Sequence, residues 1–256
     1  MDNNTLPQNN LLGLIGYPLT HSFSKKYFTD KFIKEGLTQL AYELFPIPNI
    51  SELSPLIQTH ESLVGLNVTI PYKSAVIPYL DAIHPEAEII GAVNCIVIHT
   101  QGGKKILKGY NTDIYGFEKS LYPLLDRQHD AALILGSGGA SKAVQYVLTK
   151  LGINFIIVSR SSEKGLKYEE INQEQIKHHK LIINTSPLGM YPEINNCPNI
   201  PYQFLSAEHL CMDLIYNPEE TLFLNKAKAH GAITKNGLEM LYLQAEKAWE
   251  YFTDTE

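Results

Sequence analysis

Cysteine is scarce in this sequence, and its few cysteines stand far apart. The 256 residues include only three, Cys95, Cys197 and Cys211. An odd number at these spacings indicates neither a disulfide framework nor a C-x-x-C zinc site. We therefore expect the three side chains to be small buried hydrophobic groups, and we expect no metal site.

Long hydrophobic runs and excess positive charge are also missing. No apolar stretch approaches the roughly 20 residues of a membrane-spanning helix. The first ten residues, MDNNTLPQNN, lack the basic and apolar parts of a secretory signal, so we expect a cytoplasmic protein that does not bind membranes. The net charge of −6 argues against nucleic-acid binding, which needs a basic face. A small polar molecule is the partner that this composition favours.

The first half of the chain alternates short apolar runs with helical patterns. Its predicted strands are residues 11–16, 40–47 and 64–69 and a hairpin over 93–111. Residues 73–91 predict a helix in two pieces, broken by Pro78 and Pro85. The pattern indicates a mixed α/β domain.

The second half repeats the alternation with strands that are almost purely apolar. The predicted strands are 131–136, 154–159, 180–185, 210–215 and 232–235. Such runs suit strands that are covered on both faces, and their alternation with helices predicts a parallel, doubly wound sheet. We expect two domains, 1–113 and 114–235, followed by an amphipathic helix within 236–256.

A glycine-rich turn, LILGSGGASKAV (133–144), joins the first of these strands to a predicted helix. Backbone N–H groups at such a helix start can hold a pyrophosphate. Gly136, Gly138 and Gly139 match the dinucleotide fingerprint, but Ser141 replaces its third glycine. The turn predicts a dinucleotide-binding site.

The end of the next strand favours NADP over NAD. An acidic residue about 20 positions after the glycines usually binds the free ribose hydroxyl of NAD, and no carboxylate stands at this strand tip. A guanidinium with nearby hydroxyls suits a 2′-phosphate instead. The candidate residues are Ser159, Arg160, Ser161 and Lys164. A solvated surface arginine without a ligand is the alternative.

Polar side chains gather where the predicted elements of the first half end. Ser22 and Ser24 stand at a helix start, where hydroxyls either cap the helix or bind a carboxylate. Thr69 ends a predicted strand and Lys73 follows it, and Asp113 stands at another strand-to-helix switch. Each alone can be a cap, a turn former or a surface residue. Beside a nucleotide domain, a lysine held by an aspartate suits hydride transfer, which needs a proton donor and acceptor for the substrate oxygen.

Eight motifs, in this order, resemble those of the shikimate dehydrogenase family and cover nearly the whole chain. They are GLIGYPLTHSFS, NVTIPYK, GAVNCIV, GYNTDIYGF, GSGGASKA, INTSPLGM, DLIYNP and GLEMLYLQA. The resemblance implies an N-terminal substrate domain, a Rossmann-like NADP domain and a C-terminal helix that returns to the first domain. It also implies reversible, NADPH-dependent reduction of 3-dehydroshikimate to shikimate in aromatic amino-acid biosynthesis. We expect a monomer or a homodimer.

The same resemblance implies a role for each motif residue. Lys73 and Asp113 would be the catalytic pair, with the lysine protonating the substrate oxygen as hydride arrives. Substrate binding would fall to Ser22, Ser24, Thr69, Asn94, Tyr216 and Gln244. Cofactor binding would fall to Gly136, Gly138, Gly139, Ala140, Ser159, Arg160, Ser161, Lys164, Gly237 and Met240.

Two alternatives stay open at this point. One is a quinate/shikimate dehydrogenase that uses NAD, although such relatives tend to carry an acidic residue near the position of Arg160. The other is a catalytically inactive nucleotide-binding protein on the same fold, although Lys73 and Asp113 are both present. The sequence also departs from the family pattern, with Lys25 in place of a proline and Cys95 in place of a threonine.

Overall fold

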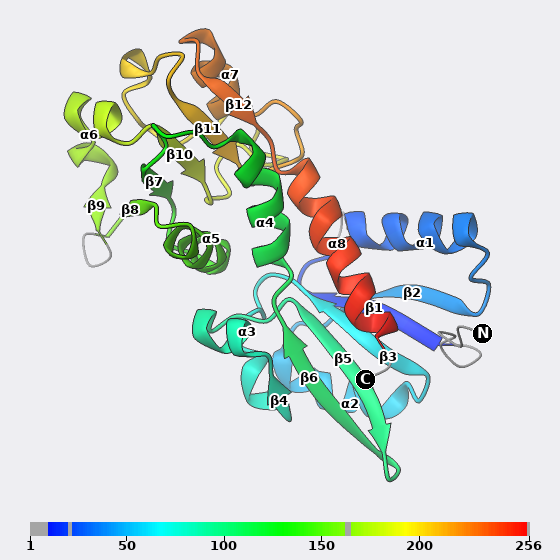
Figure 1. Ribbon diagram of the computed structural model, residues 1–256. Helices are drawn as coiled ribbons and strands as arrows, with labels where there is room; N and C mark the ends of the chain where they lie inside the picture. The colour runs from blue at the N-terminus through cyan, green and yellow to red at the C-terminus, as the bar shows by residue number, and fades with distance from the viewer. Residues whose placement is uncertain (1–9, 20–21, 162–164, 255–256) are drawn as a thin grey trace. The chain divides into compact units, whose positions relative to one another are not determined.

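The computed structural model describes residues 10–19, 22–161 and 165–254 (Figure 1). The chain divides into two compact units: unit 1 is Met1–Thr112 with Ala245–Glu256, and unit 2 is Asp113–Gln244. Each unit has a six-stranded sheet and a hydrophobic core of its own.

Unit 1 is built on a mixed sheet. Its order is β2 (Leu40–Pro46), β1 (Asn10–Gly16), β3 (Leu63–Val68), β5 (Cys95–Gln101), β6 (Lys104–Tyr110) and β4 (Ala82–Ile83). Strand β1 pairs in parallel with β2 and β3, whereas β5 runs antiparallel to β3 and β6. Gly102 and Gly103, both with positive φ, form the turn between β5 and β6. The predicted mixed α/β fold and the predicted hairpin are confirmed.

One predicted helix of this unit is wrong. The helices of unit 1 are α1 (Phe23–Glu35), α2 (Leu53–Thr59) and α3 (Pro85–Ile90), with short 3₁₀ turns η1 (Ile50–Glu52) and η2 (Ile77–Tyr79). Within 73–91 only α3 is an α-helix, and its first residue is Pro85. Pro78 has no N–H to donate to the Ser74 carbonyl, as an α-helix would require, and the chain forms the 3₁₀ turn η2 there instead.

Alternating side chains of the unit 1 sheet enter two different apolar clusters. Leu12 and Leu14 of β1 join one cluster, and Ile15, the next residue along the strand, joins the other. The first cluster includes Phe28 of α1, and the second includes Leu53 of α2. Side chains that alternate between the two faces of a sheet, with both faces buried, are typical of a central strand.

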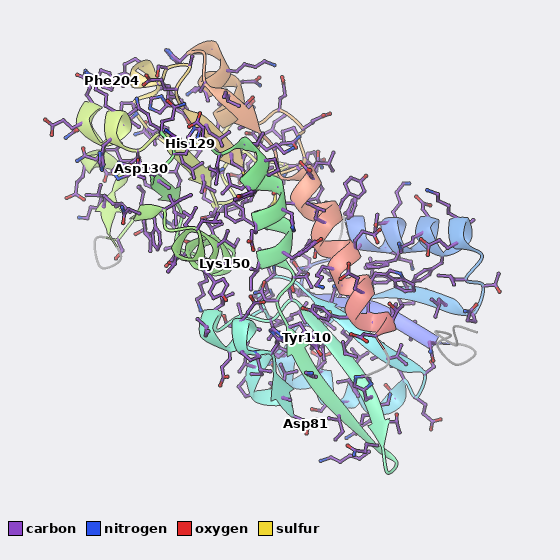
Figure 2. All side chains as sticks on the ribbon, in the orientation of Figure 1. Asp81, Tyr110, His129, Asp130, Lys150 and Phe204 are labelled. Carbon is purple, nitrogen blue, oxygen red and sulfur yellow. The ribbon has the colours of Figure 1, made fainter. Side chains whose placement is uncertain are left out.

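The last helix, α8 (Leu238–Thr253), starts in unit 2 and ends in unit 1. Its buried residues Ala245, Ala248 and Phe252 belong to the cluster formed with α1. Tyr110, labelled in Figure 2, stacks on Tyr251 with ring centroids 4.1 Å apart. The end of the chain therefore completes the core of the first unit.

Unit 2 carries a fully parallel sheet. Its order is β12 (Ile233–Lys235), β11 (Leu210–Asp213), β10 (Leu181–Asn184), β7 (Ala131–Leu135), β8 (Asn154–Ser159) and β9 (Leu166–Lys167). Its helices are α4 (Asp113–Leu121), α5 (Gly139–Lys150), α6 (Gln173–His178) and α7 (Leu222–Ala229), with 3₁₀ turns at Tyr122–Leu124, Tyr168–Glu170 and Tyr202–Phe204. Counted from β7, this is the Rossmann order 3-2-1-4-5-6, so the predicted doubly wound sheet is confirmed.

The structure also bears on the expectations about cysteine burial, metal sites and membrane spans. Cys95 and Cys211 are buried as expected, whereas Cys197 is only half-buried. Among the described residues, no three His, Cys, Asp or Glu side chains form a group that could hold a metal ion. No helix within the described ranges has the length and apolar character needed to cross a membrane.

Candidate functional site

Ser22 occupies the N-cap position of α1 without capping the helix. Its backbone is extended, as at an N-cap (φ −97°, ψ 119°), but its side chain makes no cap hydrogen bond. Its Oγ atom is buried and has no hydrogen-bond partner among the described residues. Because an unpaired buried polar group costs about 1–3 kcal/mol, this hydroxyl is a strong candidate for contacting a ligand.

Ser24 is held by a buried tyrosine that sequence reasoning missed. Tyr42 donates from its hydroxyl to Asn67 Oδ1 over 2.8 Å and accepts a hydrogen bond from Ser24. Burial raises the pKa of Tyr42 well above its usual value, and the Ser24 hydrogen bond partly opposes that shift. The tyrosine therefore stays neutral and connects Ser24 to strand β3. Its signal in the sequence was a hydroxyl at an inward position of the apolar run LAYELFPI.

Asn94 fixes the chain just before the first helix of unit 2. Its Oδ1 accepts from the backbone N of Thr112 over 2.7 Å and from Thr112 Oγ1 over 3.2 Å. Both residues are buried. Asn67 Nδ2 also donates to the Asn94 carbonyl over 3.5 Å, so Asn94 belongs to the same polar network as Tyr42. A contact of Asn94 with a substrate hydroxyl stays a prediction.

Thr69 and Lys73 lie on a backbone segment anchored from both sides. The Thr69 N–H donates to the Ile15 carbonyl over 2.9 Å, and the Lys73 carbonyl accepts from the Val93 N–H over 2.7 Å. Both side chains are half-buried. A Cβ atom on Gly16 would lie 2.5 Å from the Thr69 methyl group, so a glycine is needed where the two strands end together.

Asp113, the expected partner of Lys73, is the first residue of α4 and is buried. A carboxylate at this position interacts favourably with the helix dipole. Lys73 belongs to unit 1 and Asp113 to unit 2, and their pairing stays a prediction.

The other two expected substrate residues also belong to unit 2. Tyr216 follows β11 and is half-buried, and burial raises the pKa of its hydroxyl. Gln244 lies on α8 and donates from Nε2 to the Leu241 carbonyl over 2.9 Å. The six expected substrate residues are therefore divided between the units.

The glycine-rich turn forms an open cradle at the start of α5. Gly136 has φ +118°, and a Cβ atom there would lie 2.8 Å from Thr185 Oγ1, so only glycine fits. Gly138 is the N-cap residue of α5 and Gly139 its first residue, followed by the half-buried Ala140. A Cβ atom on Gly138 or Gly139 would meet no described atom within 4 Å. Open space above a helix N-terminus fits a pyrophosphate group.

The end of β8 presents an exposed arginine next to this turn. The Gly136 N–H donates to the Val158 carbonyl over 2.8 Å, which ties the turn to β8. Ser159 is buried, and its hydroxyl donates to the Ser161 carbonyl over 2.5 Å, so it shapes the loop. Arg160 is exposed, and no carboxylate in the described part of the chain forms an ion pair with it. Lys164 lies outside the described residues.

Gly237 and Met240, both expected to bind the cofactor, are constrained by the protein itself. A Cβ atom on Gly237 would lie 2.1 Å from the Leu214 carbonyl oxygen, so the close approach of two backbone segments requires glycine. Met240 is buried. Their contact with a cofactor stays a prediction.

A buried carboxylate, also missed by sequence reasoning, lies where β10 and β11 end. Asp213 is fully buried and stands opposite Asn184 in the parallel register. Burial raises its pKa to about 6, although hydrogen bonds from Thr221, Ile215 and Asn184 oppose this shift. The sequence pattern that could have indicated this pair is that Asn184 and Asp213 are the polar last residues of two otherwise apolar strands.

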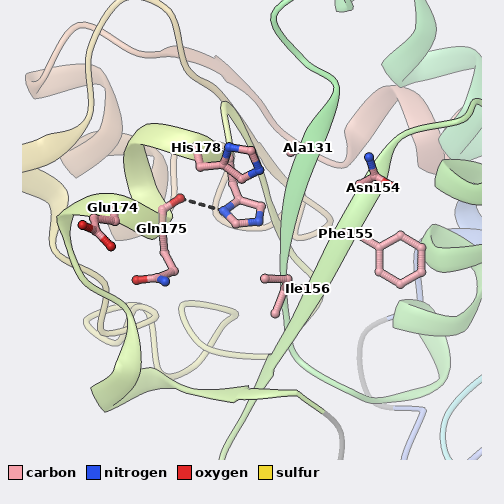
Figure 3. Close-up of a pocket in the computed structure, with 8 residues that line it drawn as sticks. Ala131, Asn154, Phe155, Ile156, Glu174, Gln175 and His178 are labelled. Atoms are coloured by element: carbon pink, nitrogen blue, oxygen red, sulfur yellow. Dashed lines mark hydrogen bonds between the residues drawn. The ribbon is translucent and has the colours of Figure 1, made fainter.

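A hollow of about 480 Å³ lies at the other end of β7 and β8 (Figure 3). It is lined by Ala131 and Asn154, the first residues of these strands, and by Glu174, Gln175, His178 and His179, among others. His179 contacts the Gln175 carbonyl through Nδ1 at 2.7 Å. Ligands of doubly wound sheets bind outside the carboxyl ends of the strands, so this hollow is separate from the predicted nucleotide site.

Comparison with known proteins shows similarity along nearly the whole chain. Residues 14–96 match the family model described as the shikimate dehydrogenase substrate binding domain. The shikimate dehydrogenase (NADP(+)) of Methanosphaera stadtmanae is 38% identical, over 95% of this chain and 91% of the relative.

Two solved structures illustrate the structural similarity. The shikimate 5-dehydrogenase of Thermus thermophilus, in complex with NADP(H) and shikimate, is 29% identical with a TM-score of 0.82, covering 95% of this chain and 93% of that chain. The quinate dehydrogenase of Corynebacterium glutamicum, in complex with NAD, is 27% identical with a TM-score of 0.85, covering 96% and 94%. Both units of this chain are therefore included in the similarity.

Proposed function

The chain belongs to the shikimate dehydrogenase family, and from this premise we propose that it catalyses the reversible, NADPH-dependent reduction of 3-dehydroshikimate to shikimate. The observation that carries the proposal furthest is the glycine cradle of α5 beside an exposed arginine. That pair of features suits a dinucleotide with an additional phosphate group. We further propose unit 1 as the substrate domain and unit 2 as the NADP domain of a cytoplasmic monomer or homodimer.

The cofactor side of the reaction would depend on backbone donors and two cations. NADPH, when bound, supplies the hydride that reduces the carbonyl carbon. The free N–H groups at Gly138, Gly139 and Ala140 would hold the pyrophosphate. The Arg160 guanidinium and the Ser161 hydroxyl would bind the 2′-phosphate, and Lys164 would add a second cation. Gly237 and Met240 would lie against the nicotinamide.

The substrate carboxylate would bind at the start of α1. Ser22 can donate to it without breaking a hydrogen bond, because its hydroxyl has no partner among the described residues. Ser24 must first turn its proton away from Tyr42. Ser22 is therefore the stronger donor of the two. Thr69, Asn94, Tyr216 and Gln244 would contact the remaining oxygen atoms of the substrate.

Lys73 would act as the general acid. Its ammonium group would give a proton to the carbonyl oxygen as the carbon receives hydride, so the ketone becomes an alcohol. Asp113 would orient the lysine and accept a hydrogen bond from a substrate hydroxyl. Afterwards Lys73 would regain a proton from solvent, and in the reverse direction it would act as the base.

A matrix of activities tests the proposal against its alternatives. NADPH and NADH formation is followed by absorbance, with shikimate or quinate as substrate and NADP or NAD as cofactor. We expect shikimate with NADP to give the highest kcat/KM. Faster turnover of quinate with NAD would indicate the quinate/shikimate enzyme, and no turnover with any pair would indicate an inactive nucleotide-binding protein.

Replacing Lys73 tests the catalytic assignment. Lys73→Ala should lower kcat by roughly 10²–10⁴-fold, the usual contribution of a general acid, while NADPH binding measured by fluorescence stays unchanged. Lys104→Ala is the matched control, because Lys104 is exposed at the turn between β5 and β6. Wild-type turnover in Lys73→Ala would remove this residue from the mechanism.

A further inference from the structure

The carboxyl ends of β10 and β11 lie beside the proposed nucleotide site. In the strand order of unit 2, the direction of winding reverses between β7 and β10. Ligands of doubly wound sheets bind at this reversal. The loop after β10 contacts the glycine turn directly, because Thr185 donates from Oγ1 to the Leu135 carbonyl over 3.1 Å and limits the space at Gly136.

One buried carboxylate joins three segments at this edge. Asp213 Oδ1 accepts from Asn184 Nδ2 and from the Ile215 N–H, each over 3.0 Å. Its Oδ2 accepts from Thr221 Oγ1 over 2.6 Å, and the same oxygen of Thr221 caps α7 by accepting from the Leu224 N–H. The end of β10, the loop after β11 and the start of α7 therefore depend on one side chain.

The two loops are connected to each other through this network. Asn184 accepts at Oδ1 from the N–H of Ser186 over 3.0 Å and from its hydroxyl over 2.7 Å, which fixes the first turn of the loop after β10. Further along, the Tyr191 N–H donates to the Asn217 carbonyl over 3.2 Å. Asn217 directly follows Tyr216, one of the expected substrate residues.

The network has no cation of its own. Within the described residues, no lysine, arginine or histidine is among the groups that shift the pKa of the Asp213 carboxyl group. Its three hydrogen-bond donors are an amide, a hydroxyl and a backbone N–H. A buried carboxylate without a cation is costly unless its hydrogen bonds are complete. Here they hold two loops at the proposed site.

We propose that Asp213 is a positioning residue that fixes the loops after β10 and β11 for cofactor binding and for placement of Tyr216. The inference rests on the proposed function for the identity of the cofactor and the substrate. The acceptor geometry of the side chain is what matters. An amide oxygen at Oδ1 would keep the contacts to Asn184 and Ile215, and its NH₂ group would donate to Thr221.

The test measures NADPH affinity by fluorescence titration and kinetics in the full-length protein. Asp213→Ala should raise the NADPH Kd about tenfold or more and lower kcat, because loops displaced by as little as 1 Å can cost about 10²-fold. Asp213→Asn should restore the Kd to within about threefold, since most of its hydrogen bonds persist. A folded Asp213→Ala protein with wild-type Kd and kcat/KM would overturn the inference.

A matched control lies at the opposite end of the same strand. His209 is buried, accepts from the Ser206 N–H over 3.0 Å and contacts the Ile176 carbonyl over 2.9 Å, yet it lies just before β11 rather than after it. His209→Ala should lower stability without changing the NADPH Kd. An equal rise in Kd in His209→Ala would show a general structural effect and overturn the positioning role.

A second variant covers the case in which Asp213→Ala does not fold. Thr221→Val keeps the side-chain volume and removes both the donor to Asp213 and the acceptor that caps α7, so the Kd in the folded fraction should still rise about threefold; an unchanged Kd would overturn the inference. If the wild type binds NADPH but does not reduce 3-dehydroshikimate, the proposed function fails. A raised Kd in Asp213→Ala would then still support the positioning of the loops.

Discussion

Two serines of one motif differ in a way that their sequence does not reveal. Ser22 and Ser24 stand two positions apart, and either could cap a helix or bind a carboxylate. In the structure the buried Ser22 hydroxyl has no hydrogen-bond partner among the described residues, whereas Ser24 of α1 bonds to Tyr42 of strand β2. A residue type and its spacing could predict a polar site at the helix start, but the packing of β2 decides which hydroxyl is available.

Replacing Ser22 separates a capping role from a binding role. Ser22→Ala removes a hydroxyl that has no described partner, so the free energy of unfolding should stay unchanged or rise slightly. The KM for shikimate should rise about 10–100-fold, as expected for losing a hydrogen bond to a charged group. Thermal unfolding and steady-state kinetics measure both effects.

Ser51→Ala serves as the control, because Ser51 lies exposed on the short turn η1 of the same unit. It should leave the KM unchanged. A Ser22→Ala protein with lower stability and an unchanged KM would show that the hydroxyl serves the fold.

Elements were predictable wherever the pattern was long and unambiguous. The apolar runs of unit 2 located its central strands, because a buried parallel strand needs apolar side chains on both faces. Of the helix predicted in two pieces over 73–91, only α3 is an α-helix, because Pro78 cannot donate the backbone hydrogen bond that would continue an earlier helix. The end of β8 was predicted as a phosphate site from residue types alone. The structure adds that Ser159 is used by the loop itself and that Arg160 is exposed.

The tip of β8 should determine the choice between NADP and NAD. Arg160→Ala should lower kcat/KM for NADPH about 10–100-fold, the loss expected for a charged hydrogen bond, and should change the value for NADH much less. The control is Arg127→Ala, since Arg127 is the only other arginine of the chain and is also exposed. If the ratio of kcat/KM for NADPH to kcat/KM for NADH stayed unchanged in Arg160→Ala, residues other than Arg160 would bind the 2′-phosphate.

At the scale of the whole molecule, α8 links the units through one continuous helix. Its amphipathic pattern was plain in the sequence, but a pattern gives the apolar face and not the surface that it covers. The structure places Ala245, Ala248 and Phe252 in the core of unit 1. Phe252 packs so closely on β3 that a Cβ atom on Gly65 would lie 2.4 Å from its ring. The Phe252 ring can therefore occupy this place only because residue 65 is a glycine and has no side chain.

Truncating this ring should destabilise the first unit. Phe252→Ala should lower the free energy of unfolding by about 3–5 kcal/mol, the usual cost of removing a buried aromatic side chain. Trp249, the only tryptophan, lies 5.6 Å from Phe32 between ring centroids, so its fluorescence in a denaturant titration reports on this core. Ile33→Ala, at a residue 76% exposed on α1, should change stability by less than about 0.5 kcal/mol. Equal effects of the two substitutions would contradict the packing described.

The division of α8 also has a consequence for the order in which the protein is made. Synthesis proceeds from the N-terminus, and domains tend to fold as units while the chain emerges. Unit 2 is one uninterrupted segment, Asp113–Gln244, whereas unit 1 needs Phe252 to fill its core. The core of unit 1 is therefore completed only after unit 2 has been synthesised, and until then α1 covers the face of the sheet that α8 later helps to bury.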